Sequence, residues 1–321
     1  MRKRNLGSTD IKITPIIMGT WQAGKTMWTG IEDKKSIKAM RNAFVAGITA
    51  FDTAEVYGEG HSERMLGEAL KDIREKVVFM TKVFSNHLEK DQVLAACDRS
   101  LENLRTDWID LYQVHWPPGS FGHKKVPVRE TFEALNQLRE EGKIKAVGVS
   151  NFSLDQLKEA RKYADIASVQ PPYSLFWRHI EKDLQPYCVD NNISILAYSP
   201  MAQGILTGKF GPDHKFEKGD HRAANKLFQP SVFARVQEAL DRLRPIAERH
   251  GVTLGQLALA WVCAQPNTCA IAGARSADQI MESAKASLVR LSEEDMDEMD
   301  EISRTVMAEV DDSSTVMWKW G

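Results

Sequence analysis

The sequence predicts one (β/α)8 barrel, preceded by a β-hairpin and followed by extra helices at the C-terminus. Three observations predict this fold: eight short apolar runs, helical patterns between them, and no break in composition along residues 1–321. Alternating strand and helix patterns are typical of a parallel sheet, and eight repeats close a barrel. A barrel domain typically spans about 250 residues plus insertions, so the chain is long enough for one such domain.

The eight runs have the composition of strands that are buried on both faces. They are rich in β-branched residues, are bounded by turn formers and lack regular polar alternation. In chain order they occupy residues 13–19, 48–52, 77–82, 109–115, 144–150, 166–170, 193–199 and 268–273. Ahead of them, residues 2–6 and 11–13 flank a Gly-Ser-Thr-Asp turn, which predicts the hairpin.

The segments between the runs include amphipathic patterns of helical length. Helices are predicted at residues 34–47, 91–104, 129–142 and 153–164. Gly47 is a plausible helix end, and Ser153 with Gln156 three residues later forms a capping-box pattern. Residues 204–228, after the seventh run, form the longest irregular stretch, and a loop of that length in a compact domain is more often functional than idle.

The composition excludes several classes of partner. The formal charge is −2, with 43% hydrophobic and 27% charged residues, so nothing suggests binding to nucleic acid or to an anionic membrane. No apolar run approaches the roughly 18 residues of a membrane span, and the basic N-terminus has no apolar stretch behind it. The four cysteines form no CxxC pair. We therefore expect a cytoplasmic protein with unpaired thiols, either a monomer or a weak homo-oligomer.

Polar side chains gather at the carboxyl ends of neighbouring predicted strands, where barrel enzymes place their chemistry. Asp52 ends the second run, Lys82 the third and His115 the fourth, and Tyr57 lies in the loop after Asp52. Taken singly, each residue is better explained by a structural role, since a lone histidine is most often a satisfied core residue. Their common position at the ends of three consecutive strands predicts a catalytic site instead.

The chemistry that these four residues permit is proton transfer to a carbonyl oxygen. A buried lysine needs an anionic partner, and Asp52 is placed to supply it. A tyrosine has a reference pKa of about 10, and a neighbouring ammonium is expected to lower the pKa of Tyr57. Tyr57 would then donate a proton as a hydride arrives at the carbonyl carbon, or accept one in the reverse reaction, while His115 hydrogen-bonds the same oxygen. No metal, nucleophile or covalent intermediate is needed.

Several motifs resemble those of the aldo-keto reductase family, in order and over nearly the whole chain. They are FDTAEVYGEGHSERMLGEAL (residues 51–70), the lysine of VVFMTKV, IDLYQVHWP, GKIKAVGVSNF, AYSPMAQGILTGK and AGARSADQIMES (residues 272–283). The long loop after the seventh run and the AGAR motif are closer to the bacterial and potassium-channel β-subunit-like branch. The resemblance implies a catalytic tetrad of Asp52, Tyr57, Lys82 and His115.

The resemblance also implies a site for NADPH or NADP⁺ across the barrel mouth. The cofactor would be contacted by Gly19, Thr20, Trp21, Asp52, Ser150, Asn151, Gln170, Tyr198, Ser199, Met201, Gln203, Lys209, Gly273, Arg275, Gln279 and Glu282. An arginine suits a 2′-phosphate, which favours NADPH over NADH. The substrate, a small carbonyl compound or alcohol, would contact Trp21, Tyr57, Phe84, His115 and Trp116. The family's usual Asn at the end of the last motif is Ser283 here, and Pro171 and Pro172 follow the retained Gln170.

Two other functions are compatible with the sequence. The channel β-subunit relatives keep the fold and the cofactor in a regulatory role, so the chain is also a candidate NADP(H)-binding redox sensor. Residues 19–26 (GTWQAGKT) satisfy the phosphate-loop pattern of NTPases, but no helical pattern begins before about Asp33, so we interpret the match as coincidence. The C-terminal tail, with Trp318 and Trp320, either shapes the substrate pocket or packs on the barrel surface.

Overall fold

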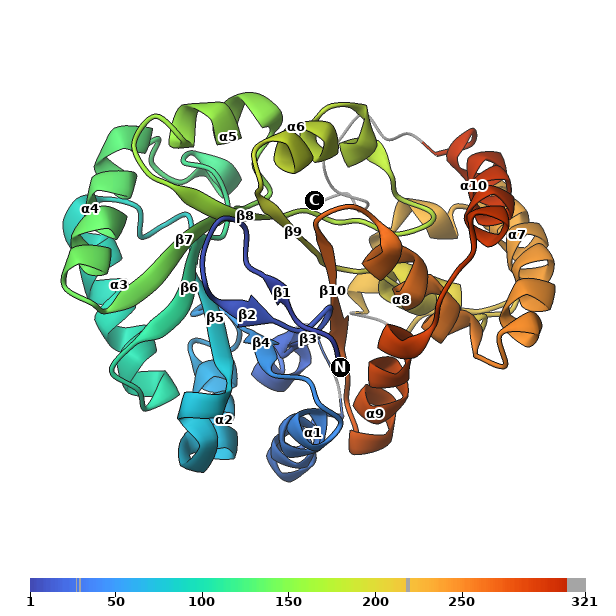
Figure 1. Ribbon diagram of the computed structural model, residues 1–321, viewed down its shortest axis with the longest axis horizontal. Coiled ribbons are helices and arrows are strands. Elements are labelled where there is room, and N and C mark those ends of the chain that lie inside the picture. Colours follow the sequence, from blue (N-terminus) through green and yellow to red (C-terminus); the bar gives the residue numbers. More distant parts are fainter. Residues whose placement is uncertain (27, 29, 218–219, 311–321) are drawn as a thin grey trace.

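Eight parallel strands form a closed barrel in the computed structural model, which describes residues 1–26, 28, 30–217 and 220–310 (Figure 1). The strands pair in the order β10-β3-β4-β5-β6-β7-β8-β9. Their bounds are β3 (Ile16–Gly19), β4 (Ala50–Asp52), β5 (Val78–Val83), β6 (Ile109–Val114), β7 (Ile144–Ser150), β8 (Ile166–Gln170), β9 (Ser194–Ala197) and β10 (Thr268–Gly273). The predicted barrel is confirmed.

An N-terminal hairpin closes one end of the barrel, as the sequence predicts. Its strands, β1 (Arg4–Asn5) and β2 (Lys12–Ile13), pair antiparallel. Leu6 and Ile13 are fully buried and pack with the apolar side chains that fill the barrel interior. The first apolar run therefore divides between two elements, because its first residue belongs to the hairpin and only Ile16–Gly19 enters the barrel.

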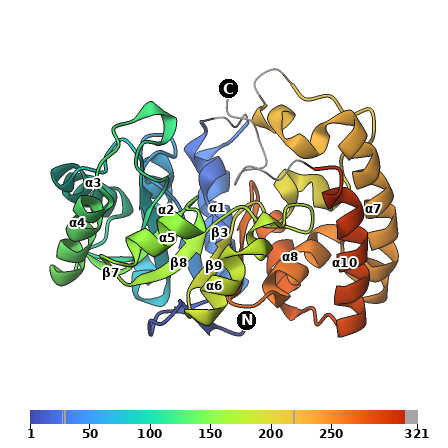
Figure 2. The ribbon, with the colours of Figure 1, turned by 90° about the horizontal axis from the view of Figure 1, so that it is seen from above.

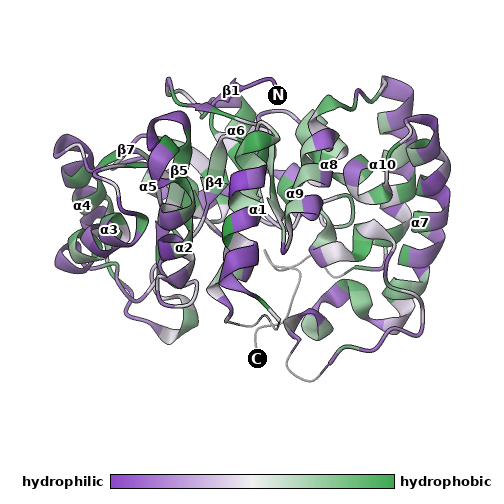
Figure 3. Ribbon diagram, turned by 90° about the horizontal axis from the view of Figure 1, so that it is seen from below, coloured by the Kyte–Doolittle hydropathy of each residue, from purple (hydrophilic) through white to green (hydrophobic). Residues whose placement is uncertain are grey.

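Helices surround the barrel and cover its outer face. Those that follow the strands are α1 (Asp33–Val45), α2 (His61–Leu70), α3 (Lys90–Leu104), α4 (Val128–Glu140), α5 (Leu154–Ala160), α6 (Leu184–Asp190), α8 (Leu254–Ala264) and α9 (Ala277–Lys285). The Ser153–Gln156 capping box begins α5, and Gly47 adopts φ +90° just beyond the end of α1. Individual helices carry both purple and green segments in Figure 3, as expected for helices with one face on the core.

Two further helices lie beside each other at one side of the barrel (Figures 1 and 2). They are α7 (Pro230–Arg249), which comes between β9 and α8, and α10 (Glu293–Met307) near the C-terminus. The loop before α7 contains three short 3₁₀ segments, at Ala202–Thr207, His221–Ala224 and Lys226–Phe228. Parts of the long stretch that the sequence marks as irregular therefore form short helical turns.

Candidate active site

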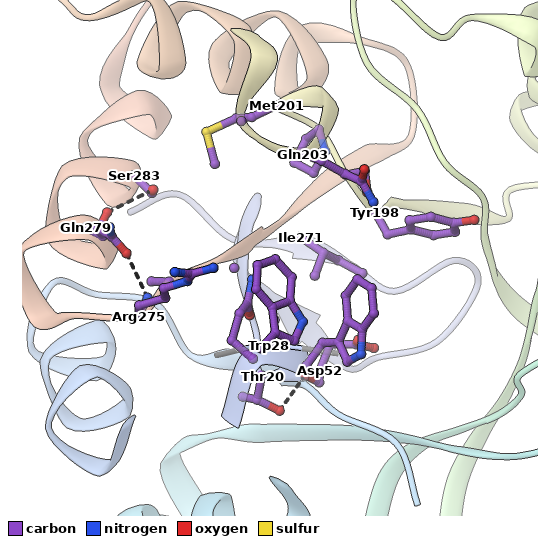
Figure 4. Close-up of a pocket in the computed structure, with 18 of the residues that line it drawn as sticks. Thr20, Trp28, Asp52, Tyr198, Met201, Gln203, Ile271, Arg275, Gln279 and Ser283 are labelled. Atoms are coloured by element: carbon purple, nitrogen blue, oxygen red, sulfur yellow. Dashed lines mark hydrogen bonds between the residues drawn. The ribbon is translucent and has the colours of Figure 1, made fainter. Parts of the chain in front are cut away.

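A pocket of about 770 Å³ opens at the carboxyl ends of the barrel strands. This volume is within the range of small-molecule and cofactor sites. Every candidate site residue from the sequence except Lys82 lines it, namely Gly19, Thr20, Trp21, Asp52, Tyr57, Phe84, His115, Trp116, Ser150, Asn151, Gln170, Tyr198, Ser199, Met201, Gln203, Lys209, Gly273, Arg275, Gln279 and Glu282. The labelled side chains in Figure 4 show this gathering, with Arg275 and Gln279 at one end and Asp52 and Tyr198 toward the other.

Lys82 lies beneath the pocket and is fully buried beside Asp52. Its Nζ donates to Asp52 Oδ1 and to the Thr53 carbonyl oxygen, each at 2.6 Å. Burial lowers the pKa of Lys82, and the Asp52 carboxylate opposes that shift. Because two oxygen acceptors contact the ammonium, the structure stabilises the charged pair that the sequence predicts.

Tyr57 lies above this ion pair, with Lys82 Nζ 5.1 Å from the centroid of its ring. The expectation that Lys82 lowers the pKa of Tyr57 is wrong in this structure. Burial raises the pKa of Tyr57 well above its ordinary value, and the Asp52 carboxylate raises it further. The physical reason is that Asp52 compensates the charge of Lys82, so that desolvation of the phenolate dominates. The phenol is consequently protonated at neutral pH.

His115 is buried next to the Tyr57 ring. The two ring centroids are 5.7 Å apart at an interplanar angle of 82°, and Phe84 contacts His115 from another side at 5.5 Å. Burial lowers the pKa of His115 well below its ordinary value, and Lys82 contributes to the same shift. The imidazole is therefore neutral at pH 7 and carries one N–H donor and one acceptor nitrogen.

Four polar residues meet where strands β7, β8 and β9 end. Ser150 Oγ donates to the Gln170 carbonyl oxygen at 2.8 Å, and Gln170 Nε2 donates to Asp52 Oδ2 at 2.9 Å. Asn151 Nδ2 donates to the His115 carbonyl oxygen at 3.1 Å, and Tyr198 donates its hydroxyl hydrogen to Asn151 Oδ1 at 2.8 Å. This network connects two groups of side chains. The family resemblance assigns one group to a nicotinamide and the other to the catalytic tetrad.

Basic side chains gather at the opposite end of the pocket. Lys209, Arg222 and Arg275 all line it, and the Arg275 guanidinium lies 4.8 Å from the centroid of the Trp28 ring. Burial and the Arg222 charge lower the pKa of both Lys209 and Arg275. Among the described residues, no carboxylate lies within 4 Å of the charged groups of Lys209 or Arg275. Two cations that share one pocket without carboxylate partners are suited to an anionic ligand.

The structure adds pocket residues that the sequence alone did not identify. They include Trp28, Phe121, Arg222 and Gln256, and Gln113 lies beneath the pocket near Asp52. Arg222 belongs to the irregular stretch 204–228, which the sequence had marked as functional without indicating a residue. Gln256 donates a hydrogen bond to Glu282 Oε2 at 3.0 Å. Gln256 also forms a capping box with Thr253, and this pattern in the sequence could have indicated the start of α8.

The phosphate-loop match at residues 19–26 has a different geometry from that of an NTPase. Trp21–Gly24 forms a 3₁₀ turn, and α1 begins only at Asp33. Lys25 is half-exposed and forms an ion pair of 2.9 Å with Asp33. A phosphate loop needs a helix that begins directly after it, so this segment lacks the arrangement that binds nucleoside phosphates.

In the described part of the chain, no three His, Cys, Asp or Glu side chains are grouped as metal ligands would be. All four cysteines are described, and each is a free thiol. Among the described residues, no helix combines the length and the apolar character that a membrane span requires. Trp318 and Trp320 lie outside the described residues.

Comparison with known proteins decides the family. The model of the aldo/keto reductase family matches residues 15–304. The chain belongs to the aldo/keto reductase family. It is 36% identical to "Aldo-keto reductase YhdN" of Bacillus subtilis, with 96% of each chain covered. It is 34% identical to the "NADH-specific methylglyoxal reductase" of Escherichia coli, with 95% of this chain and 99% of that protein covered.

Further relatives confirm the predicted branch of this reductase family. A probable voltage-gated potassium channel β subunit of Arabidopsis thaliana is 31% identical over 89% of this chain and 91% of its own length. The solved structure of the glycerol dehydrogenase AKR11B4 from Gluconobacter oxydans superposes with a TM-score of 0.88 at 34% identity, covering 96% of this chain and 97% of that one. An aldo-keto reductase from Klebsiella pneumoniae solved in complex with NADPH gives a TM-score of 0.77 at 30% identity, covering 94% of this chain and 96% of that one.

Proposed function

We propose that this reductase-family protein is an NADPH-dependent oxidoreductase that reduces aldehydes and ketones, sugars included, to alcohols, with Tyr57 as the general acid and base. The observation that carries the proposal is the position of Tyr57. Its ring lies over a buried Lys82–Asp52 ion pair, beside His115, at the wall of a 770 Å³ pocket. A protonated phenol next to a neutral imidazole is suited to hold and protonate a carbonyl oxygen.

The residues that line the pocket fit a nicotinamide dinucleotide. At one end, Gln170 Oε1 has no hydrogen-bond partner among the described residues, which suits it to a carboxamide. Farther along, Gln203 Nε2 is buried without a partner in the described part of the chain. Lys209 and Arg275 add positive charge where a phosphate would lie. We assign the nicotinamide to Ser150, Asn151, Gln170 and Tyr198, the diphosphate to Ser199, Met201, Gln203 and Lys209, and the adenosine end to Gly273, Arg275, Gln279 and Glu282.

The proposed reaction requires little from the protein beyond orientation and one proton. When bound, a reduced nicotinamide supplies hydride transfer to the carbonyl carbon. The Tyr57 hydroxyl donates its proton to the carbonyl oxygen, while the neutral His115 hydrogen-bonds the same oxygen and orients it. Trp21, Phe84 and Trp116 line the pocket and would hold the substituents of the substrate. In the reverse direction Tyr57 accepts the proton of an alcohol.

The preference for NADPH over NADH is part of the proposal. The guanidinium groups of Arg222 and Arg275, which lie 5.8 and 4.8 Å from the centroid of the Trp28 ring, support it, because a 2′-phosphate binds cations strongly. The structural relative from Klebsiella pneumoniae is a complex with NADPH, whereas the relative from Escherichia coli is named as NADH-specific. We further propose that the protein acts as a single domain, as a monomer or a weak homo-oligomer, in a reducing cytoplasm where its free thiols persist.

The test is oxidation of NADPH, followed at 340 nm, with a panel of aldehydes and ketones. The proposal predicts steady turnover with at least one carbonyl class and weaker activity with NADH. The likeness to a channel β subunit gives a second candidate, a redox-sensing regulatory protein. Tight NADPH binding with no turnover over the whole panel would favour that candidate and would contradict the reductase.

A further inference from the structure

The Asp52 carboxylate holds two glutamines in addition to Lys82. Lys82 occupies Oδ1, whereas Oδ2 accepts from Gln170 Nε2 at 2.9 Å and from Gln113 Nε2 at 3.4 Å. Gln113 is fully buried, and Asp52 and Gln170 are each 3% exposed. A buried carboxylate is stable only when both of its oxygens have partners. Lys82 is the partner of Oδ1, and the two glutamines are the partners of Oδ2.

The charge of Asp52 dictates how both amides are oriented. An ionised carboxylate only accepts hydrogen bonds, so each amide must present its nitrogen to Oδ2. Gln113 Oε1 in turn lies 3.3 Å from Gln170 Nε2. If the amide of Gln113 were turned over, its oxygen would face the carboxylate and its nitrogen would face the nitrogen of Gln170. Both contacts would become repulsive, so only the observed orientation of the Gln113 amide is compatible with its two neighbours.

Both N–H groups of the Gln170 amide are used by this arrangement. One hydrogen is directed to Asp52 and the other to Gln113, which leaves Oε1 as the atom that Gln170 presents to a ligand in the pocket. Gln170 can therefore accept a hydrogen bond at this position but cannot donate one. A ligand with an amide N–H₂ group matches this polarity, whereas a ligand with only a carbonyl oxygen does not.

The barrel provides space for Gln113 at this level. Gln113 on β6 is in register with Lys82 on β5 and with Gly148 on β7. A Cβ atom at position 148 would lie 2.5 Å from Ser168 Oγ and 3.0 Å from Gln113 Cγ, so a side chain there would crowd both residues. Gly148 thus allows the long amide side chain of Gln113 to reach Asp52 across the barrel interior.

We infer that Gln113 is a positioning residue for the cofactor: with Asp52, it fixes the amide of Gln170 so that only its oxygen faces the pocket and accepts from the nicotinamide carboxamide. The inference rests on the proposed function, because it assumes that a nicotinamide dinucleotide occupies the pocket. It goes beyond that function in giving Asp52 a second role besides pairing with Lys82. Gln113 touches neither substrate nor cofactor and acts through Gln170.

The test compares binding of NADP⁺ with binding of its 3-acetylpyridine analogue, in which a methyl group replaces the amide nitrogen. Dissociation constants are measured by quenching of tryptophan fluorescence, independently of turnover. The wild-type protein should bind NADP⁺ about tenfold more tightly, because the analogue leaves the Gln170 oxygen without a donor. In Gln113→Met, which removes both hydrogen-bonding groups at similar length, the Gln170 amide keeps Asp52 but loses the acceptor of its second N–H. The ratio should fall to about threefold or less, because only one of the two contacts that fix the amide remains.

Two controls separate positioning from general damage to the fold. Ser168→Ala, a buried substitution on β8 whose Oγ has no hydrogen-bond partner in the described chain, should leave the ratio unchanged. Binding of adenosine 2′,5′-bisphosphate, which lacks the nicotinamide, should be the same in all variants. If Gln113→Met does not fold, Gln113→Asn is the second variant and should lower the ratio in the same way, because the shorter amide no longer reaches Gln170.

The outcomes are distinct for the two claims. A wild-type protein that binds NADP⁺ and its analogue equally, or a Gln113→Met protein that keeps the wild-type ratio, overturns the inference and leaves the proposed function intact. A wild-type protein that binds neither dinucleotide overturns the proposed function and the inference with it.

Discussion

Lys82 Nζ lies 2.6 Å from Asp52 Oδ1, and the two side chains are 0% and 4% exposed. The pair joins the ends of neighbouring strands β4 and β5 directly below Tyr57. Both charged groups are almost completely buried, so each depends on the other. The pair is therefore a structural requirement of the barrel as well as part of the proposed site.

Replacing one partner of this pair should destabilise the protein strongly. We expect Lys82→Met to lower the free energy of unfolding by about 3–5 kcal/mol, because Asp52 is left as an unpaired buried charge. The double variant Lys82→Met/Asp52→Asn should recover much of that loss. Urea unfolding followed by circular dichroism measures both. A loss below about 1 kcal/mol for Lys82→Met would show that the pair is not needed for the fold.

The pKa shifts predict a flat pH profile for carbonyl reduction. Burial raises the pKa of Tyr57, so the phenol keeps its proton as the pH rises, and burial lowers the pKa of His115, so the imidazole stays neutral as the pH falls. Both groups are therefore in the required form at every pH between their ordinary values of about 6.5 and 10. We expect kcat to change less than about twofold from pH 6.5 to 9. A decline centred inside that interval would contradict the shifts.

Arg275 should distinguish the two nicotinamide dinucleotides. Removing its guanidinium in Arg275→Ala should weaken NADPH about 10- to 100-fold and NADH only slightly, because only NADPH carries the 2′-phosphate. Fluorescence titration with each dinucleotide measures the effect. Arg129→Ala, which removes an exposed arginine of α4, is the matched control and should change neither affinity. Equal losses for NADPH and NADH in Arg275→Ala would exclude a phosphate contact.

Gly58 holds the Tyr57 loop against the loop that follows β3. It adopts φ +64°, and a Cβ atom there would lie 2.2 Å from the Gly24 carbonyl oxygen. Gly58→Ala should therefore displace Tyr57 and lower kcat by about 10- to 100-fold, since small misplacements of a catalytic group are costly. Gly142→Ala carries a similar backbone strain, at φ +76°, but meets no atom within 4 Å, so it should keep its activity. Similar kcat values for both variants would refute the steric argument.

The sequence predicts the barrel well because each strand and helix is indicated by the residues of its own segment. Each strand is a short apolar run such as Ile144–Ser150, and α5 begins at a cap that the sequence shows, Ser153. The tetrad positions follow from the same rule, since strands of a parallel barrel end at one rim. The boundary between hairpin and barrel near Ile13 was missed because one apolar run serves two elements.

The interior of the site was less predictable, because it depends on distances between strands. The sequence predicts the pair of Lys82 and Asp52 but does not show how deeply Tyr57 is buried, and for that reason the predicted direction of the Tyr57 pKa shift was wrong. Arg222 belongs to an irregular loop without periodicity, so no pattern places it beside Arg275. Gln113 lies inside an apolar run, and only the folded barrel shows that it contacts Asp52.

Turnover by Tyr57→Phe tests the proposed role of Tyr57 most directly. The substitution removes the hydroxyl and keeps the ring over Lys82, so the dissociation constant for NADPH should stay within about twofold of the wild-type value. NADPH oxidation with the best aldehyde of the panel should fall at least about 100-fold, because the proton donor is lost. A variant that retains a kcat close to that of the wild type would contradict the assignment of Tyr57 as general acid.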